Sequence, residues 1–313
     1  MSNKPILVIF GATGNQGYST AHHILIHTTL SAKYTVRALS RTITHPLLTT
    51  LTSLGAQTAY ADMSLPSTLV PALTGVTHLF LLTTTFYTGN TRALETQHAR
   101  NVCTEAIKQG VRYIVFSSAA NASEITGGKL SNVEHFDVKA EIEAYIRNLP
   151  VQSAFFAPAS FMQNLHTHMR PQPSGEGDGS YVLATMLRDD TKVPFIDILD
   201  TGKFVGAILD EPEKYAGKYL AAAEGFYTPR EIVEVMARVT GKRVRHVQVE
   251  DEVAKARFPE GLREALGEMW VLNSEYGYYG KEQEGLVKWA REQVERELTG
   301  MEEFLRRSEF RLE

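Results

Sequence analysis

The chain has 313 residues, of which 43% are hydrophobic and 22% are charged, proportions that are ordinary for a globular protein and exclude extended disorder. Its formal net charge is -4. Because nucleic-acid binders usually carry a basic excess, we expect no direct contact with nucleic acid.

The first half of the chain alternates short apolar runs with helical segments. The apolar runs predict strands at 6–10, 34–40, 77–82, 112–118 and 151–157. These runs are continuous rather than alternating, which suits parallel strands covered on both faces. The segments between them carry apolar residues near three-to-four spacing, as amphipathic helices do. This βα series predicts an α/β fold with a doubly wound parallel sheet of the Rossmann type.

A glycine-rich segment, GATGNQG, follows the first predicted strand directly. Gly11 permits a tight turn, Gly14 lets backbone N–H groups approach a pyrophosphate, and Gly17 lets the helix and the strand pack closely. The N-terminus of the following helix favours an anion. The pattern therefore predicts a dinucleotide site at this turn.

The end of the second predicted strand, VRALSRT, indicates which dinucleotide binds. An NAD site normally offers a carboxylate here, whereas an NADP site offers an arginine to the 2′-phosphate. This segment contains Arg41 and no acid, which favours NADP(H); the alternative is a solvated surface arginine. Asp62, in the segment YADMS, either lies by the adenine or caps the following helix.

The second half of the chain follows a different pattern. The polar segment 171–180 is typical of a flexible loop, and a capping box of Thr228 and Glu231 begins a helix that should stop near Gly241. We predict an NADP-binding domain over residues 1–158 and a smaller, interleaved α/β lobe over 159–313. Within the lobe, we expect 193–209 to return to the main sheet and add a strand.

Several other types of site and segment are not indicated. The only cysteine, Cys103, is expected to be a buried small hydrophobe in a reducing compartment. The histidines lack accompanying carboxylates or cysteines at ligand spacing, so we expect no metal. No apolar stretch approaches the roughly 20 residues of a membrane span. We expect a cytoplasmic protein, monomeric or homodimeric, with nothing for or against nuclear entry.

Taken together, the motifs resemble those of the NmrA-like family of atypical short-chain dehydrogenase/reductases. The resemblance covers nearly the whole length. The motifs that carry it, in the family's order and spacing, are VIFGATGNQG, VRALSRT, VRYIVFSSAANAS, HFDVKAEIEAYIR, APASFMQNL, EPEKYAGKYL and LVKWARE.

The resemblance implies roles for individual residues. Those that would line the pyrophosphate are Gly11, Thr13, Gly14, Asn15, Gln16 and Gly17, while Arg41 would take the 2′-phosphate. Thr83 and Thr84 would lie beside the cofactor, as would Ser117, and Lys139 would reach the nicotinamide ribose. The residues implied at the nicotinamide end are Ala157, Pro158, Phe161 and Asn164.

The proton donor is the doubtful part of the chemistry. In short-chain reductases a tyrosine stands four residues before the lysine, and here that place holds His135. Hydride delivery leaves negative charge on the substrate, so a donor should lie near the nicotinamide. The catalytic candidates are Lys139, His135 and Ser118. The alternatives are that Lys139 anchors the ribose and that His135 is a packed helix residue, since an imidazole is shorter than a phenol.

The resemblance implies two functions, between which the missing tyrosine leaves the choice open. The first is an NADP(H)-binding redox sensor or regulator with little or no classical dehydrogenase activity and with a regulatory protein partner. The second is an NADPH-dependent reductase that acts on a small enone, ketone or imine and uses Lys139 or His135 as the proton donor.

Overall fold

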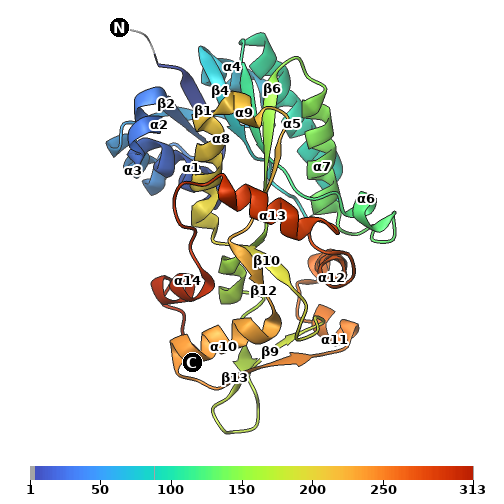
Figure 1. Ribbon diagram of the computed structural model, residues 1–313. Coiled ribbons are helices and arrows are strands. Elements are labelled where there is room, and N and C mark those ends of the chain that lie inside the picture. Colours follow the sequence, from blue (N-terminus) through green and yellow to red (C-terminus); the bar gives the residue numbers. More distant parts are fainter. Residues whose placement is uncertain (1–3, 88, 313) are drawn as a thin grey trace.

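The computed structural model describes residues 4–87 and 89–312 and contains a large parallel sheet with a smaller lobe below it (Figure 1). The sheet has seven strands in the order β11-β6-β5-β4-β1-β2-β3. Its strands are β1 (Ile6–Ile9), β2 (Thr35–Ser40), β3 (Gln57–Tyr60), β4 (Val76–Leu81), β5 (Tyr113–Ser117), β6 (Gln152–Pro158) and β11 (Tyr219–Ala222). All neighbouring strands in it are parallel, which confirms the doubly wound prediction.

Helices cover both faces of this sheet. They are α1 (Asn15–Ile26), α2 (Thr28–Lys33), α3 (Pro46–Ser53), α4 (Pro66–Leu73), α5 (Thr91–Lys108), α6 (Ala122–Thr126), α7 (Glu134–Arg147), α8 (Thr201–Asp210) and α9 (Pro212–Tyr215). Successive side chains of a strand point to opposite faces. In β1, Leu7 belongs to the core that contains α1 and α8, whereas Val8 belongs to the core that contains α5 and α7. The continuous apolar runs of the sequence supply both cores.

The smaller lobe is built on two three-stranded sheets. One sheet contains β12 (Gly225–Tyr227), β10 (Val193–Ile196) and β7 (Ser160–Phe161), and the other contains β13 (Val244–Gln248), β9 (Tyr181–Thr185) and β8 (Gln172–Pro173). The helices of the lobe are α10 (Pro229–Thr240), α11 (Asp251–Lys255), α12 (Arg263–Val271) and α14 (Met301–Arg307), whereas α13 (Gln283–Glu292) packs on β11 of the main sheet. Short 3-10 turns occur at Met162–His166, Ile198–Asp200 and Glu260–Leu262, and a π turn occurs at Leu272–Tyr276.

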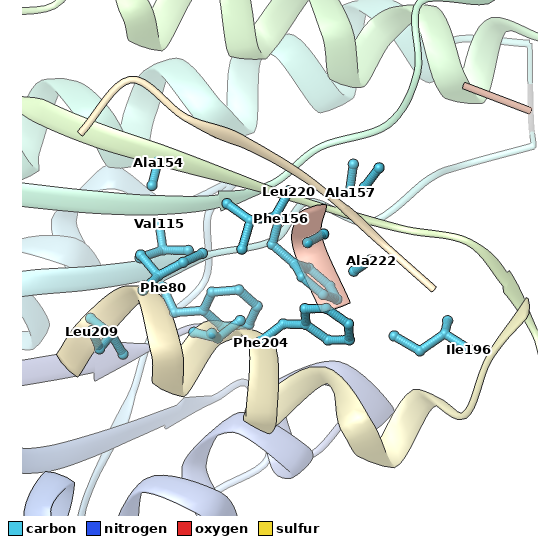
Figure 2. Packing of buried hydrophobic residues seen from close by; sticks show 14 of the residues in the cluster. Phe80, Val115, Ala154, Phe156, Ala157, Ile196, Phe204, Leu209, Leu220 and Ala222 are labelled. Carbon is cyan, nitrogen blue, oxygen red and sulfur yellow. The ribbon is translucent and has the colours of Figure 1, made fainter. Parts of the chain in front are cut away.

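The prediction that 193–209 adds a strand to the main sheet is wrong. Residues 193–196 form β10 in a small sheet, and the strand that returns to the main sheet is β11, which pairs with β6. The rest of the segment becomes α8, which lies against the face of the main sheet (Figure 2). Phe204 of α8 lies 6.1 Å from the ring of Phe156 in β6 and is fully buried. The apolar residues of 201–209 have the spacing of one helix face, and their burial places that face on the sheet.

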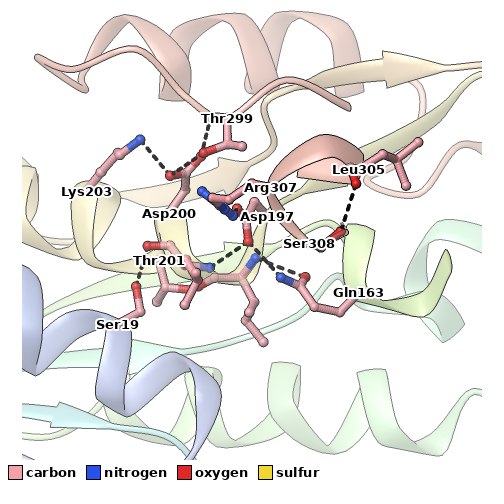
Figure 3. Close-up of polar contacts among 12 residues, drawn as sticks. Ser19, Gln163, Asp197, Asp200, Thr201, Lys203, Thr299, Leu305, Arg307 and Ser308 are labelled. Atoms are coloured by element: carbon pink, nitrogen blue, oxygen red, sulfur yellow. Dashed lines mark hydrogen bonds and ion pairs between the residues drawn. The ribbon is translucent and has the colours of Figure 1, made fainter. Parts of the chain in front are cut away.

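Two buried aspartates join α8 to the C-terminal end of the chain (Figure 3). Asp197 accepts hydrogen bonds from the Gln163 side chain at 2.7 Å and from Arg307. Asp200 accepts from the backbone N–H of Thr299 at 2.6 Å and pairs with Lys203 at 2.6 Å. Because buried charges must be paired to be tolerated, these contacts fix the C-terminal segment to the start of α8.

Candidate functional site

The loop between β1 and α1 has the geometry of a phosphate-binding turn. Gly11 has φ +61°, and the N–H of Gly14 donates to the Gly11 carbonyl oxygen at 2.8 Å. Helix α1 begins at Asn15 after Gly14, whose position carries no side-chain cap. The first N–H groups of this helix therefore have no side chain to satisfy them, and such a helix start favours an anion.

Gly17, in the first turn of α1, lies against the backbone of Phe10 and Gly11, which directly follow β1. A β-carbon at this position would lie 2.2 Å from the carbonyl oxygen of Gly11 and 2.7 Å from that of Phe10. Side chains larger than hydrogen cannot fit there without moving the backbone. The close packing that the glycine spacing predicted is therefore present.

A cavity of about 300 Å³ lies at the carboxyl ends of β1, β2 and β3. The predicted residues that line it are Gly11, Thr13, Gly14, Arg41, Asp62 and Thr84. Residues that sequence reasoning did not single out also line it, among them Ser40, Thr42, Met63, Leu82, Phe86 and His98. Ser40 and Thr42 flank Arg41, a neighbourhood that could have suggested them, whereas nothing in the pattern marked Phe86 or His98.

Arg41 and Asp62 both reach this cavity. The Arg41 side chain is exposed, as a group that receives a phosphate from solvent must be. Asp62 accepts hydrogen bonds from the N–H of Ser64 at 2.8 Å and from its hydroxyl at 2.7 Å. The pKa of Asp62 is lowered below its ordinary value, mainly by the hydrogen bond from the Ser64 hydroxyl. Asp62 thus lines the cavity and orders the turn before α4, which begins later, at Pro66.

Lys139 is held by the end of β4 and by α5. Its ammonium group donates to the carbonyl oxygen of Thr83 at 3.2 Å, to the Thr83 hydroxyl oxygen at 3.2 Å, and to Glu95 Oε1. The Thr83 hydroxyl donates in turn to the same Glu95 oxygen at 2.5 Å. Glu95 is fully buried, and its other oxygen, Oε2, has no hydrogen-bond partner. Sequence reasoning missed Glu95, which is one of several charged residues in α5.

His135 lies one helical turn before Lys139, inside an aromatic setting. Its ring is 4.8 Å from that of Phe136 and 6.0 Å from that of Tyr87, and its Nδ1 is buried with no hydrogen-bond partner. Burial, and then the charge of Lys139, lower the pKa of His135 to about 4. The imidazole is therefore neutral near pH 7.

The two serines at the end of β5 point to different partners. The Ser117 hydroxyl donates to Gln16 Oε1 of α1 at 2.7 Å. The Ser118 hydroxyl donates to Glu143 Oε2 of α7, a carboxylate that also accepts from Arg147. Burial raises the pKa of Glu143 above its ordinary value. Ser118 is thus hydrogen-bonded to α7, and Ser117 connects the phosphate-loop helix α1 to β5.

The residues expected at the nicotinamide end follow β6. Ala157 and Pro158 end that strand, Phe161 lies in β7, and Asn164 lies in the following 3-10 turn. The hydroxyl of Tyr279 donates to the Ala157 carbonyl at 2.8 Å, and that of Tyr278 donates to the Pro158 carbonyl at 3.2 Å. This places a C-terminal segment beside the end of β6. None of the four residues lines the 300 Å³ cavity, nor do Asn15, Gln16, Thr83, Ser117 and Lys139.

Three further findings bear on the chemistry. Cys103 is buried in α5, and burial raises the pKa of its thiol to about 12. Within 4–87 and 89–312, no three His, Cys, Asp or Glu side chains gather as a metal site. In the same described part of the chain, no helix combines the length and apolar character needed to cross a membrane.

Comparison with known proteins assigns the family. A model described as the NmrA-like family matches residues 2–305. The chain belongs to the NmrA-like family. It is 27% identical over 255 residues to an NmrA-like family domain-containing protein from Dictyostelium discoideum, covering 79% of this chain and 80% of that one. It is also 27% identical over 264 residues to an NmrA-like oxidoreductase of Malbranchea aurantiaca, covering 80% and 78%.

Solved structures of other proteins share the fold. NmrA, a negative transcriptional regulator solved with NADP, aligns with a TM-score of 0.79 at 22% identity, over 98% of this chain and 95% of that one. The Citrobacter triphenylmethane reductase complexed with NADP(H) aligns with a TM-score of 0.75 at 20% identity, over 97% and 99%. Neighbours of one fold thus include both a regulator and a reductase.

Proposed function

We propose that this NmrA-like chain binds NADP(H) and acts as a redox sensor or regulator with little or no classical dehydrogenase activity. Support for the cofactor comes from the uncapped start of α1 beside a cavity that Arg41 and Asp62 line. An exposed arginine at the end of β2 suits a 2′-phosphate, and charge-assisted contacts of this kind contribute about 1.5–3 kcal/mol. Structural neighbours were solved with NADP and with NADP(H), which agrees with this assignment.

The observation that carries the sensor assignment is the bonding of Lys139. A lysine ammonium has three donors, and here they have three protein acceptors, two on Thr83 and one on the buried Glu95. Transferring a proton to a substrate would leave Glu95 buried beside a neutral amine, which is costly. Lys139 is therefore suited to holding charge in place rather than to giving up a proton.

The other two candidate donors are poorly placed as well. His135 is neutral near pH 7, because burial lowers its pKa to about 4. A neutral imidazole is a weak acid, so it protonates a substrate oxygen far less readily than an imidazolium does. The Ser118 hydroxyl donates its hydrogen bond to Glu143. Lys139 and Ser118 are thus held by hydrogen bonds to carboxylates, and His135 is neutral.

A reductase remains the second candidate function. It is favoured by the partial exposure of the Lys139 side chain, 18%, and by the structural likeness to a triphenylmethane reductase complexed with NADP(H). In this alternative, Lys139 exchanges its contacts with Thr83 for contacts with substrate. The Glu95 contact then keeps the ammonium charged and oriented.

One experiment separates the two functions. The purified chain is titrated with NADPH and assayed for NADPH oxidation against a panel of enones, ketones and imines. A sensor should bind NADPH, change its assembly state or its affinity for a partner protein with occupancy, and leave the panel unreduced. A turnover on the order of one per second on any panel member would refute the sensor assignment, because that rate is ordinary for enzymes.

The regulatory partner, a monomeric or homodimeric state and the cytoplasmic location belong to the same proposal. Light scattering with and without NADPH measures the assembly state directly. A partner would be sought by comparing which proteins the chain retains in NADPH and in NADP⁺, and equal retention in both would argue against sensing.

A further inference from the structure

The two charges of the Lys139–Glu95 ion pair lie at different depths below the protein surface. The Glu95 side chain is 0% exposed and the Lys139 side chain is 18% exposed, so the negative end is sealed in the protein and the positive end is closer to water. Thr83 bridges the two, since it bonds to both. The pair is therefore a fixed dipole rather than two mobile surface charges.

The pair also lies near the expected nicotinamide end of the cofactor. The cavity with Arg41 lies over β2 and β3, and the pyrophosphate turn follows β1. A dinucleotide crosses the carboxyl edge where the strand order reverses, here between β1 and β4. Thr83 follows β4, and its neighbour Thr84 lines the cavity, so the nicotinamide half extends toward Lys139.

Oxidised and reduced nicotinamide differ in charge at this end. The ring of NADP⁺ is cationic, whereas the ring of NADPH is neutral. We propose that the Lys139–Glu95 pair makes the site selective for reduced over oxidised cofactor, because its positive end opposes the cationic ring. This inference rests on the proposed function and supplies the physical basis by which the site would distinguish the two redox states.

The other charged groups near the pair make contacts of their own. Arg92, on α5, pairs with Glu134 at 3.5 Å and with Glu141 of α7. Asp137 accepts hydrogen bonds from the N–H of Ser123 at 2.9 Å and from its hydroxyl. Arg92 is thus held by carboxylates and Asp137 by neutral groups of Ser123, whereas Lys139 is the cation whose ammonium contacts the end of β4.

The test compares the ratio of two dissociation constants, that of NADP⁺ divided by that of NADPH. Glu95→Gln leaves the lysine charge unbalanced, so the ratio should rise by about threefold or more. Lys139→Met removes the positive end, so the ratio should fall by a similar factor, whether or not Glu95 then takes up a proton. These opposite shifts are the signature of the proposal, because a packing defect would weaken both cofactors alike.

Three controls keep the result interpretable if a variant is unstable. Adenosine 2′,5′-bisphosphate, which lacks the nicotinamide half, should bind all variants with the wild-type affinity if they are folded. Lys139→Arg keeps the charge and should keep the ratio nearer to wild type than Lys139→Met does. Glu284→Gln makes the same chemical change at an exposed pair with Lys192 and should leave the ratio unaltered.

Each outcome has a distinct meaning. Ratios that move in opposite directions for Glu95→Gln and Lys139→Met support the inference. Equal ratios in wild type and both variants, or shifts of the same sign, overturn it even though NADPH binds. A wild-type protein that binds neither NADPH nor adenosine 2′,5′-bisphosphate overturns the proposed function itself.

Discussion

The carbonyl oxygen of Gly11 occupies the space that a β-carbon at Gly17 would need, with only 2.2 Å between them. This contact sets how closely α1 approaches β1. Because α1 starts at the phosphate turn, the same approach also sets where its first N–H groups point. Both the stability of the fold and the binding of an anion at α1 therefore depend on the absence of a side chain at Gly17.

Gly17→Ala should destabilise the protein and weaken NADPH binding together. Overpacking a tight contact costs about 1–3 kcal/mol, and here the obstructing atoms are backbone. Urea unfolding and an NADPH titration measure the two effects. Gly14→Ala is the matched control for stability, because its β-carbon would meet only the Gly11 oxygen, at 3.4 Å. Equal loss of stability in the two variants would contradict this account.

The main sheet could be predicted because its strands are simple to recognise. Predicted strands such as 6–10 and 34–40 correspond to Ile6–Ile9 and Thr35–Ser40. Capping chemistry was equally local, since Thr228 and Glu231 form the expected box and Gly241 ends the helix with φ 69°. The segment 193–209 failed because short apolar runs fit a strand or a buried helix equally well, and only tertiary packing decides.

Some residues of the candidate site could likewise be predicted from the sequence, and others could not. The phosphate turn and Arg41 were predictable, because backbone geometry and charge there act through residues adjacent in sequence. Glu95 was not, because nothing in an amphipathic helix marks which carboxylate will be buried against a lysine 44 residues away. Tyr279, which bonds to the Ala157 carbonyl, was missed as a partner of β6 for the same reason.

Arg41→Ala should weaken NADPH binding by about 1.5–3 kcal/mol and leave NADH binding nearly unchanged. The side chain is exposed at the cavity that Asp62 also lines, so it can reach a 2′-phosphate without disturbing packing. Titration of both cofactors by calorimetry measures the effect, with NADH as the internal control. Equal losses for the two cofactors would show that Arg41 does not contact the 2′-phosphate.

His135→Phe should be nearly silent in NADPH binding at pH 7.5 but should change the acid sensitivity of the fold. Burial lowers the pKa of His135 to about 4, and burial does the same for His23 and His78. Between about pH 6.5 and pH 4 the unfolded chain binds protons that the folded chain refuses, so stability is full above this window and falls as the pH drops through it.

For each of these histidines the loss is on the order of 1–3 kcal/mol. Urea unfolding at pH 7.5 and pH 4.5 measures the difference for wild type and for His135→Phe, and the variant should lose less stability on acidification. An unchanged difference would mean that folding does not lower the pKa of His135. In that case His135 would again be a candidate proton donor.

Lys139→Met should destabilise the fold far more than a surface lysine substitution does. Glu95 is fully buried, and removing one partner of a buried pair costs about 3–5 kcal/mol, because the remaining charge is left without compensation. The double variant Glu95→Gln/Lys139→Met removes both charges and should recover much of that loss. Urea unfolding of the two single variants and the double variant gives the coupling energy directly.

Lys192→Met, at an exposed pair with Glu284, is the matched control and should cost less than about 1 kcal/mol. Additive losses in the double variant would show that Lys139 and Glu95 do not stabilise each other.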